Sequence, residues 1–255
     1  MDFPINFHIG SITILSHPFF QFLAFTFGYW YYRYLQKRKP TAPFSEEMHW
    51  SILIGMIIGA FIGSRLVAAL EDPALFIHSA SWLYYVGSQT VLGGLIGGII
   101  GVEISKKIIG LKRKTGDVFV FPIMLAIMIG RIGCLMTGVT DGTVGLPSNL
   151  PWAFDQGDGI ARHPTSAYEI LFILLLFFTL KYLSSPKFSK YLQEGDLFRF
   201  FIIGYGLFRL FIEFIKPIHV LFLGLSSIQL VSLVAVIYYS QYFIRRLLTS
   251  KKIPI

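Results

Sequence analysis

Seven apolar runs constrain the fold of this chain more than any other feature of its sequence. A helix needs about 20 mostly apolar residues to cross the roughly 30 Å hydrocarbon core of a bilayer. Charged residues make up only 14% of the 255 residues, whereas about 25% is usual in soluble domains. The sequence therefore predicts an all-α integral membrane protein. The predicted spans are residues 11 to 32, 51 to 70, 86 to 104, 117 to 136, 167 to 184, 198 to 215 and 220 to 244.

Most of the 22 basic residues fall in four clusters, which follow the first, third, fifth and seventh predicted spans. With seven spans, all four clusters lie on one side of the membrane. The positive-inside rule makes that side cytoplasmic, so the N-terminus is predicted outside and the C-terminus inside. The formal charge of +8 is then a consequence of topology. We expect the lipid bilayer as a partner and no nucleic acid.

The long connection between the fourth and fifth spans, residues 137 to 166, is predicted to be an ordered outer cap. It is rich in Gly, Pro, Asp and Asn, and long irregular loops are usually either functional or disordered. Trp152, Phe154 and His163 within it, and Tyr168 just beyond it, argue against disorder. The first residues carry Asp2 and no basic segment, so no cleavable signal peptide is expected. Residues 1 to 255 are predicted to form a single membrane domain.

The sequence predicts no metal site and no cofactor. The acids of the outer loop, with His163, show no recognised ligand spacing and are expected to be solvated. The single cysteine, Cys134, excludes an internal disulfide and a cysteine-based metal cluster. A free cysteine in a membrane helix is usually a small apolar residue. The acids concerned are Asp141, Asp155 and Asp158.

Three arginines lie inside apolar spans, where each costs on the order of 3 kcal/mol by insertion scales. At about 1.5 Å rise per residue, Arg65 and Arg131 would lie roughly 21 Å from the cytoplasmic end of their spans and Arg209 roughly 16 Å. All three would therefore lie between the bilayer middle and its outer half. The planar guanidinium matches phosphate geometry and stays charged, so the sequence indicates a site for a lipid headgroup.

Structural explanations compete with the headgroup site at two of these arginines. Arg209 and Glu213 are spaced i,i+4 and could neutralise each other on one helix face. Arg131 has no acid within one helical turn and needs a partner from elsewhere in the protein or from a ligand. Arg65 could extend to the outer interface beside two following acids, Glu71 and Asp72.

The third predicted span carries two further features. The segment "GGLIGG", residues 93 to 98, has small residues four apart, which is typical of close helix packing. Glu103 has Lys107 at i+4, which favours an interfacial ion pair over a proton relay.

Four motifs in order resemble the bacterial prolipoprotein diacylglyceryl transferases. They are "GRIG" at the end of a predicted helix, "GLPSNLPWAF" in the outer loop, "RHPTSAYE" opening the next helix and "YGLFRLFIEF" in the sixth span. The resemblance is clearest over residues 86 to 216. It implies seven membrane helices with the N-terminus outside, in agreement with the topology from charge, and a location in the bacterial plasma membrane.

The resemblance also implies an activity: transfer of the diacylglyceryl group of phosphatidylglycerol to the lipobox cysteine of an exported prolipoprotein. The arginine of the family signature matches Arg131, and a second essential arginine with its tyrosine and glutamate matches Arg209, Tyr205 and Glu213. These four residues are the predicted catalytic residues. The predicted substrate-binding residues are Arg131, Arg209, Gly93, Gly94, Arg162, His163 and Tyr168.

The chain departs from the family pattern at four positions. Cys134 and Val139 replace an asparagine and a glutamate of the signature, and Leu92 replaces the histidine that precedes two glycines. The N-terminal tyrosine of the family is unmatched at "LSHPFF", where His17 and Pro18 stand. The alternatives are a noncatalytic phospholipid-binding protein and a lipid transferase with another acceptor. A solute carrier is disfavoured, because the sequence has no inverted repeat.

Overall fold

The structure is a computed structural model that describes residues 3–38, 45–71, 73, 77, 88–217 and 220–250. Nearly all regular structure in these residues is helical, as predicted, apart from two short hairpins. The chain forms two compact units. Unit 1 comprises Met1–Lys39 and Thr115–Pro217, and unit 2 comprises Pro40–Lys114 and Ile218–Ile255. The single membrane domain stays a prediction.

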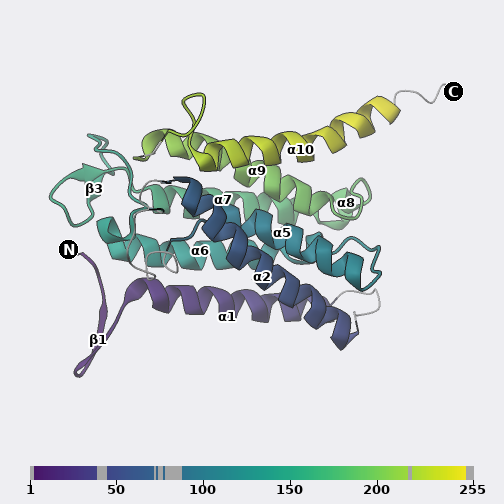
Figure 1. Ribbon diagram of the computed structural model, residues 1–255, viewed down its shortest axis with the longest axis horizontal. Helices are drawn as coiled ribbons and strands as arrows, with labels where there is room; N and C mark the ends of the chain where they lie inside the picture. Colours follow the sequence, from purple (N-terminus) through teal and green to yellow (C-terminus); the bar gives the residue numbers. More distant parts are fainter. Residues whose placement is uncertain are drawn as a thin grey trace. The chain divides into compact units, whose positions relative to one another are not determined.

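Unit 1 contains four long helices, and the chain passes through residues 40–114 of unit 2 between the first of them and the second. In Figure 1, α1, α6 and α7 lie side by side. The elements of unit 1 are β1 (Phe7–Ile9), β2 (Ile12–Ile14), α1 (Ser16–Lys37), η1 (Gly116–Val118), α6 (Val120–Thr137), η2 (Gly138–Asp141), β3 (Phe154–Asp155), β4 (Ala161–Arg162), α7 (Thr165–Leu183), α8 (Pro186–Ser189), α9 (Asp196–Ile212) and η3 (Glu213–Ile215).

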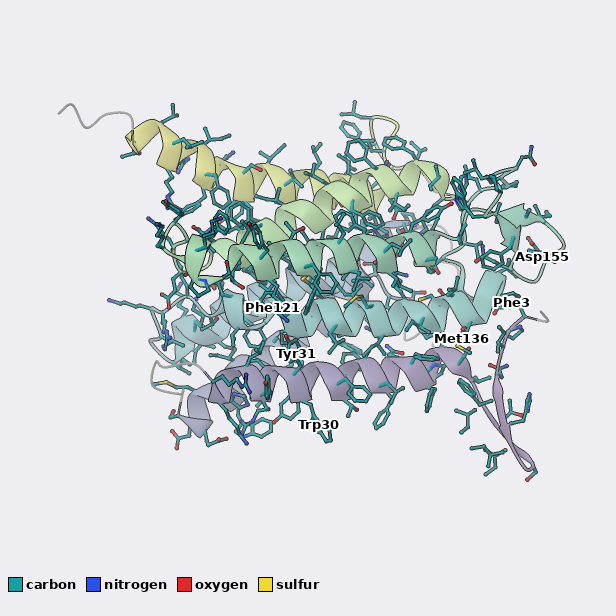
Figure 2. All side chains as sticks on the ribbon, turned by 180° about the vertical axis from the view of Figure 1, so that it is seen from behind. Phe3, Trp30, Tyr31, Phe121, Met136 and Asp155 are labelled. Atoms are coloured by element: carbon teal, nitrogen blue, oxygen red, sulfur yellow. The ribbon has the colours of Figure 1, made fainter. Side chains whose placement is uncertain are left out.

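The first predicted span begins too early. Residues 12 to 14 form β2 and pair with β1 in an antiparallel hairpin, so the helix begins at Ser16. Pro18 then lies in the first turn of α1, where a missing backbone N–H breaks no intrahelical hydrogen bond. The hydropathy of residues 11 to 15 does not distinguish this hairpin from a helix. Trp30, farther along α1, points away from α6 (Figure 2).

Small residues bring α1 close to α6. A Cβ atom on Gly133 of α6 would lie 2.9 Å from Cβ of Phe20, and one on Gly28 of α1 would lie 3.3 Å from Cβ of Ala126. At the other end of α1, the Tyr32 ring stacks on Phe119, with ring centroids 4.6 Å apart. The N-terminal part of α1 is therefore held against the last turns of α6, which carry the signature arginine.

The start of α9 is fixed by a carboxylate from another part of unit 1. Asp117, in η1, accepts hydrogen bonds from the backbone N–H groups of Gly195 (2.7 Å) and Phe198 (3.0 Å). These N–H groups have no partner within the helix, and a carboxylate also favours the positive end of the helix dipole. Farther along, Phe208 of α9 stacks on Phe172 of α7 at 4.4 Å between centroids. The cap by Asp117 and the stack on Phe172 therefore hold α9 in place at two points along its length.

Unit 2 contains α2 (Glu46–Glu71), α5 (Val91–Ile108) and α10 (Ser227–Ser250). The first two helices pack with their backbones nearly in contact. Cβ atoms added to Gly59 or Gly97 would lie 2.2 Å from a backbone oxygen of the facing helix. The close packing predicted from "GGLIGG" is confirmed. The predicted ion pair on α5 is wrong in its partner, because Glu103 pairs with Lys106 at 2.8 Å instead of Lys107.

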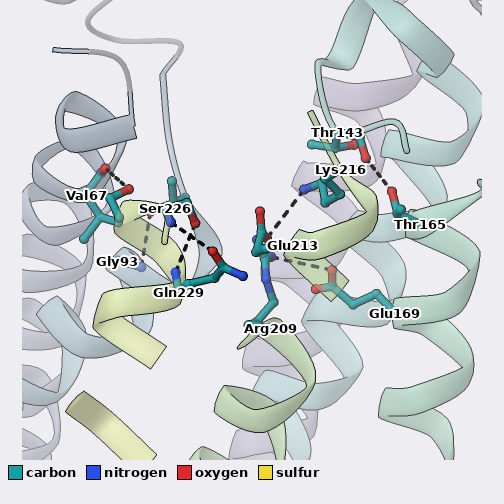
Figure 3. A network of polar contacts seen from close by, with 12 residues as sticks. Val67, Gly93, Thr143, Thr165, Glu169, Arg209, Glu213, Lys216, Ser226 and Gln229 are labelled. Atoms are coloured by element: carbon teal, nitrogen blue, oxygen red, sulfur yellow. Dashed lines mark hydrogen bonds and ion pairs between the residues drawn. The ribbon is translucent and has the colours of Figure 1, made fainter. Parts of the chain in front are cut away.

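A reciprocal cap begins α10 (Figure 3). The backbone N–H of Ser226 donates to Oε1 of Gln229 at 2.9 Å, and the N–H of Gln229 donates to Oγ of Ser226 at 3.2 Å. This is a capping box, which satisfies two N–H groups at once. The helix therefore begins at Ser227, and the predicted start of the seventh span at residue 220 is wrong. The apolar residues before it form a tight turn, with Phe222 bridged to Leu225.

Each of the seven predicted spans overlaps a helix in the described part of the chain. Four of these helices are long and apolar enough to cross a membrane, namely α2, α6 with η2, α7 and α10. α5 carries Glu103, Lys106 and Lys107 close to its end, and α9 has 17 residues. The protein is thus an all-helical membrane protein, and the count of seven spans stays a prediction.

The packing of α2 against α5 predicts unequal effects for two neighbouring glycines. Gly97→Ala places a Cβ atom 2.2 Å from the Gly59 carbonyl oxygen, and overpacking of this kind costs about 1–3 kcal/mol. We expect a lower midpoint of thermal unfolding in detergent. Gly98→Ala is the control, because its Cβ meets Ala60 and Met56 at 3.6 Å. It should unfold at or above the parental temperature; equal losses in both variants would contradict the packing described here.

Candidate active site

The candidate site lies within unit 1, where three helices bring five polar side chains together. Arg131 comes from the C-terminal half of α6, and Glu169 from the second turn of α7. Tyr205 and Arg209 lie one turn apart on α9, and Glu213 begins η3 directly after that helix. All five residues are buried, with 0 to 6% of their surface exposed. The predicted catalytic residues are therefore together in space.

The carboxylate of Glu169 is the centre of this cluster. Its Oε1 lies 2.9 Å from Nε of Arg131 and accepts a hydrogen bond of 2.8 Å from the Tyr205 hydroxyl. Its Oε2 lies 3.6 Å from Nη1 of Arg209. Arg209 also donates through Nη2 to Oε1 of Glu213. Figure 3 shows Glu213 at the end of the Arg209 side chain and Glu169 beyond it. One acid from α7 therefore joins the two predicted arginines.

A lysine completes the cluster. Nζ of Lys216 lies 3.8 Å from Oε1 of Glu213 (Figure 3). In their usual ionisation states, three cations then face two carboxylates, which leaves one excess positive charge. Nε of Arg131 and Nε of Arg209 are buried without an aligned hydrogen-bond partner. Buried polar groups are normally hydrogen-bonded, so exceptions of this kind need an explanation.

The three predicted substrate-binding residues around the start of α7 form a separate group. Arg162 is paired with Asp158 of its own loop, at 2.6 Å between Nη2 and Oδ2. The Tyr168 hydroxyl lies 3.2 Å from Nδ1 of His163 and accepts a hydrogen bond of 2.6 Å from Trp152. These contacts organise the outer loop. Among the described residues, no side-chain hydrogen bond or ion pair joins this group to the five-residue cluster, although Tyr168 precedes Glu169 in the chain.

The tip of the outer loop is a tight, hydrogen-bonded turn. The backbone N–H groups of Gly157, Asp158 and Gly159 all donate to Oδ1 of Asp155, at 2.8 to 3.0 Å. These bonds, that of Gly157 foremost, hold the pKa of the Asp155 carboxyl below its usual value. Figure 2 shows Asp155 in the loop beyond the end of α6. Order in the outer loop is therefore supported by specific contacts.

Unit 2 contains Gly93 and Gly94, which were predicted to bind substrate, and Arg65, which was predicted to lie at a headgroup site. Gly93 approaches α2 closely, and a Cβ atom there would lie 2.5 Å from the Gly63 carbonyl oxygen; Gly94 has ordinary contact distances. Arg65 donates to Ser64 Oγ at 2.8 Å and lies 3.9 Å above the Phe61 ring. Leu92, at the position of the family histidine, is fully buried in α5. Substrate binding by Gly93 and Gly94 stays a prediction.

Sequence reasoning missed Glu169 and Lys216. Glu169 is the last letter of the quoted motif "RHPTSAYE", two residues inside the predicted fifth span. An acid so close to a span end does not look buried, although a search for partners of the intramembrane arginines could have found it. Lys216 is one residue beyond the predicted sixth span. The expectation that Arg131 needs a distant partner is confirmed, and that partner is Glu169.

Removing the charge of Glu169 should destabilise the protein strongly. Glu169→Gln keeps the shape but leaves two buried guanidinium groups without their shared anion, and breaking a buried pair costs about 3–5 kcal/mol. Glu103→Gln is the matched control, because the Glu103 side chain is 63% exposed and such pairs contribute about 0–1 kcal/mol. Thermal unfolding in detergent measures both. A small and equal effect would show that Glu169 does not hold the cluster.

Comparison with known proteins agrees with the motifs. The family model described as "Prolipoprotein diacylglyceryl transferase" matches residues 4–245. The phosphatidylglycerol–prolipoprotein diacylglyceryl transferase of Wolbachia pipientis wMel is 29% identical over 245 residues, covering 90% of this chain and 89% of that protein. The namesake from Idiomarina loihiensis is 30% identical over 250 residues, covering 92% and 89%. The one from Pseudoalteromonas translucida is 30% identical over 225 residues, covering 84% and 79%. This chain therefore belongs to the prolipoprotein diacylglyceryl transferase family.

Proposed function

We propose that this protein transfers the diacylglyceryl group of phosphatidylglycerol to the lipobox cysteine thiol of exported prolipoproteins. The observation that carries the proposal is the buried cluster around Glu169, in which two guanidinium groups, with the partly buried Lys216 beside them, face two carboxylates. An isolated buried charge is unfavourable in a medium of low dielectric constant. A phosphodiester carries one negative charge, and its oxygens accept hydrogen bonds from guanidinium groups. A bound phosphatidylglycerol headgroup would therefore neutralise the cluster.

The same arrangement suits the chemistry of the transfer. The acceptor thiolate attacks the carbon of the diacylated glycerol that is bonded to the phosphate oxygen. A carbon–sulfur bond forms there, and the bond between that carbon and the phosphate oxygen breaks. Negative charge grows on the departing glycerol phosphate, and preorganised cations stabilise such charge best in a site with little water. Arg131 and Arg209 are the residues for this role. Glu169 orients both of them, Tyr205 hydrogen-bonds Glu169, and Glu213 pairs with Arg209.

The proposal includes a topology and a location. Seven spans with the N-terminus outside place the outer loop and the motif arginines toward the outer leaflet of the bacterial plasma membrane. Exported prolipoproteins present their signal peptides on that side. The basic clusters after alternate spans support this orientation. Holding lipid and signal peptide side by side would add the advantage of proximity.

One observation favours a second candidate, a noncatalytic phospholipid-binding protein. Leu92 stands where the family resemblance implies a histidine. A thiol with an ordinary pKa near 8.5 is only a few per cent ionised at neutral pH, so a site without a base works slowly. A transferase with a different acceptor is also compatible with the cluster. The proposed transferase and the phospholipid-binding protein differ in whether the lipobox peptide gains mass.

The test uses the purified full chain with phosphatidylglycerol vesicles and a lipobox peptide. Mass spectrometry should show a diacylglyceryl group on the peptide cysteine, with release of glycerol phosphate. Arg131→Lys and Arg209→Lys keep a charge but lose the planar donor fork. Loss of one such transition-state contact should lower the rate about 10²–10³-fold.

Lys187→Ala, in the short helix α8, is the control and should keep the parental rate. Peptide without added mass, under conditions where an authentic transferase works, would overturn the enzymatic proposal. Stabilisation of the protein by phosphatidylglycerol in the same preparation would then support the binding protein, and lipid consumed without peptide modification would indicate another acceptor.

A further inference from the structure

A second cluster of reactive side chains lies beside Arg131 and has no part in the site described above. It consists of His17 in the first turn of α1, Cys134 near the end of α6 and Asp141 at the end of η2. One ring nitrogen, the thiol sulfur and one carboxylate oxygen lie within 4.8 Å of one another. Cys134 is buried and the Asp141 side chain is 6% exposed, whereas the His17 side chain is 32% exposed, so the cluster is open on one side.

The three possible ligand atoms of this cluster lie close together, with His17 and Asp141 at ion-pair distance. Nδ1 of His17 lies 2.6 Å from Oδ1 of Asp141. This nitrogen is nevertheless buried without an aligned hydrogen-bond partner. The other oxygen of Asp141 accepts a hydrogen bond of 2.5 Å from Thr143. One carboxylate oxygen is thus fixed by the loop, while the other faces the imidazole and the thiol.

The donor set identifies the class of cation. Imidazole nitrogen, thiolate sulfur and carboxylate oxygen are the three ligand types of Zn²⁺, with bonds of about 2.0–2.3 Å. In a tetrahedral site such bonds separate the ligand atoms by roughly 3–4 Å. Atoms within 4.8 Å of one another need only small side-chain movements to reach this geometry. Three protein ligands and one open position are the arrangement of catalytic zinc sites.

We propose that His17, Cys134 and Asp141 bind a zinc-class divalent cation, and that its open position takes the acceptor cysteine as a thiolate. This inference rests on the proposed function. A coordinated thiol is deprotonated by the metal. The cation would therefore do what a histidine at position 92 could otherwise do. It supplies the nucleophile without a separate base.

The position of the cluster suits that role. Nη1 of Arg131 lies 3.5 Å from Sγ of Cys134, one turn along α6. Arg131 is one of the two arginines proposed to hold the lipid phosphate. Thiolate and leaving group would therefore be held on neighbouring turns of one helix. The proton leaves the thiol for water when the metal binds it, the sulfur–carbon bond then forms, and glycerol phosphate departs with the electron pair of the broken carbon–oxygen bond.

Cobalt titration tests the metal site without any need for activity. The full chain, purified in detergent without a polyhistidine tag, is stripped with a chelator and titrated with Co²⁺. We expect one equivalent to bind, with a sulfur-to-cobalt charge-transfer band in the near ultraviolet and visible bands typical of tetrahedral cobalt. Added Zn²⁺ should abolish both. Cys134→Ser should lose the charge-transfer band, and His17→Ala or Asp141→Asn should weaken binding at least tenfold.

Two further variants make the test specific. His8→Ala removes an exposed imidazole from the N-terminal hairpin and should bind cobalt as the parent does. Thr143→Ala removes the hydrogen bond to Asp141 and should weaken binding about 10–100-fold, as loss of a residue that orients a ligand does. Absence of the charge-transfer band in the parental protein would overturn the site, provided that the stripped protein is still folded. A thermal transition equal to that before stripping would show that it is folded. A band that survives Cys134→Ser would also overturn the site.

The lipidation assay separates this inference from the proposed function. Adding a chelator should abolish transfer to the peptide, and Zn²⁺ should restore it. Transfer that continues at full rate in metal-free protein would overturn the metal while leaving the transferase intact. A cobalt site in a protein that never modifies the peptide would leave the metal intact and overturn the transferase.

Discussion

The carboxylate of Glu169, shared between two buried arginines, is the interaction on which unit 1 depends. It is the point where α6, α7 and α9 meet through charged groups. Moving any of these helices by one turn would leave a charge buried without its partner, at an effective penalty of several kcal/mol per ion. The cap of α9 by Asp117 and the aromatic stack between α7 and α9 fix the same helices elsewhere. Apolar packing alone would leave their register less defined.

Stability is not a sufficient reason for such a cluster. Replacing buried ion pairs by apolar residues is often neutral or stabilising, so a chain selected for stability alone has little need of them. The residual positive charge and the unaligned Nε atoms support the proposal that an anion with several acceptor oxygens binds here. A lipid phosphate carries a negative charge and has several acceptor oxygens. Membrane helices rarely carry ionisable residues without such a function.

The sequence predicted the arginines of the site and missed the acid that joins them, for one physical reason. Arg131 and Arg209 stand out because a charge inside an apolar run is expensive at any depth. Glu169 stands at the start of a run, where an acid is ordinary, and its partners come from α6 and α9, which are distant in the sequence. Helix starts at Ser16 and Ser227 were misplaced because apolar residues also form hairpins and turns. Hydropathy reports burial in lipid and not the hydrogen-bond pattern that ends a helix.

The cluster of His17, Cys134 and Asp141 could not be predicted from the sequence, for a related reason. Metal sites are found in a sequence by short ligand spacings, and these residues come from two distant segments. Two of the three, His17 and Cys134, stand where the family resemblance implies a tyrosine and an asparagine. Taken singly, each departure looks like loss of function. In the structure both side chains reach the same point beside Arg131, which is difficult to explain as two independent losses. A thiol and an imidazole that lie together, next to a carboxylate held by Thr143, support the proposal that a metal ion activates the acceptor thiol in this chain.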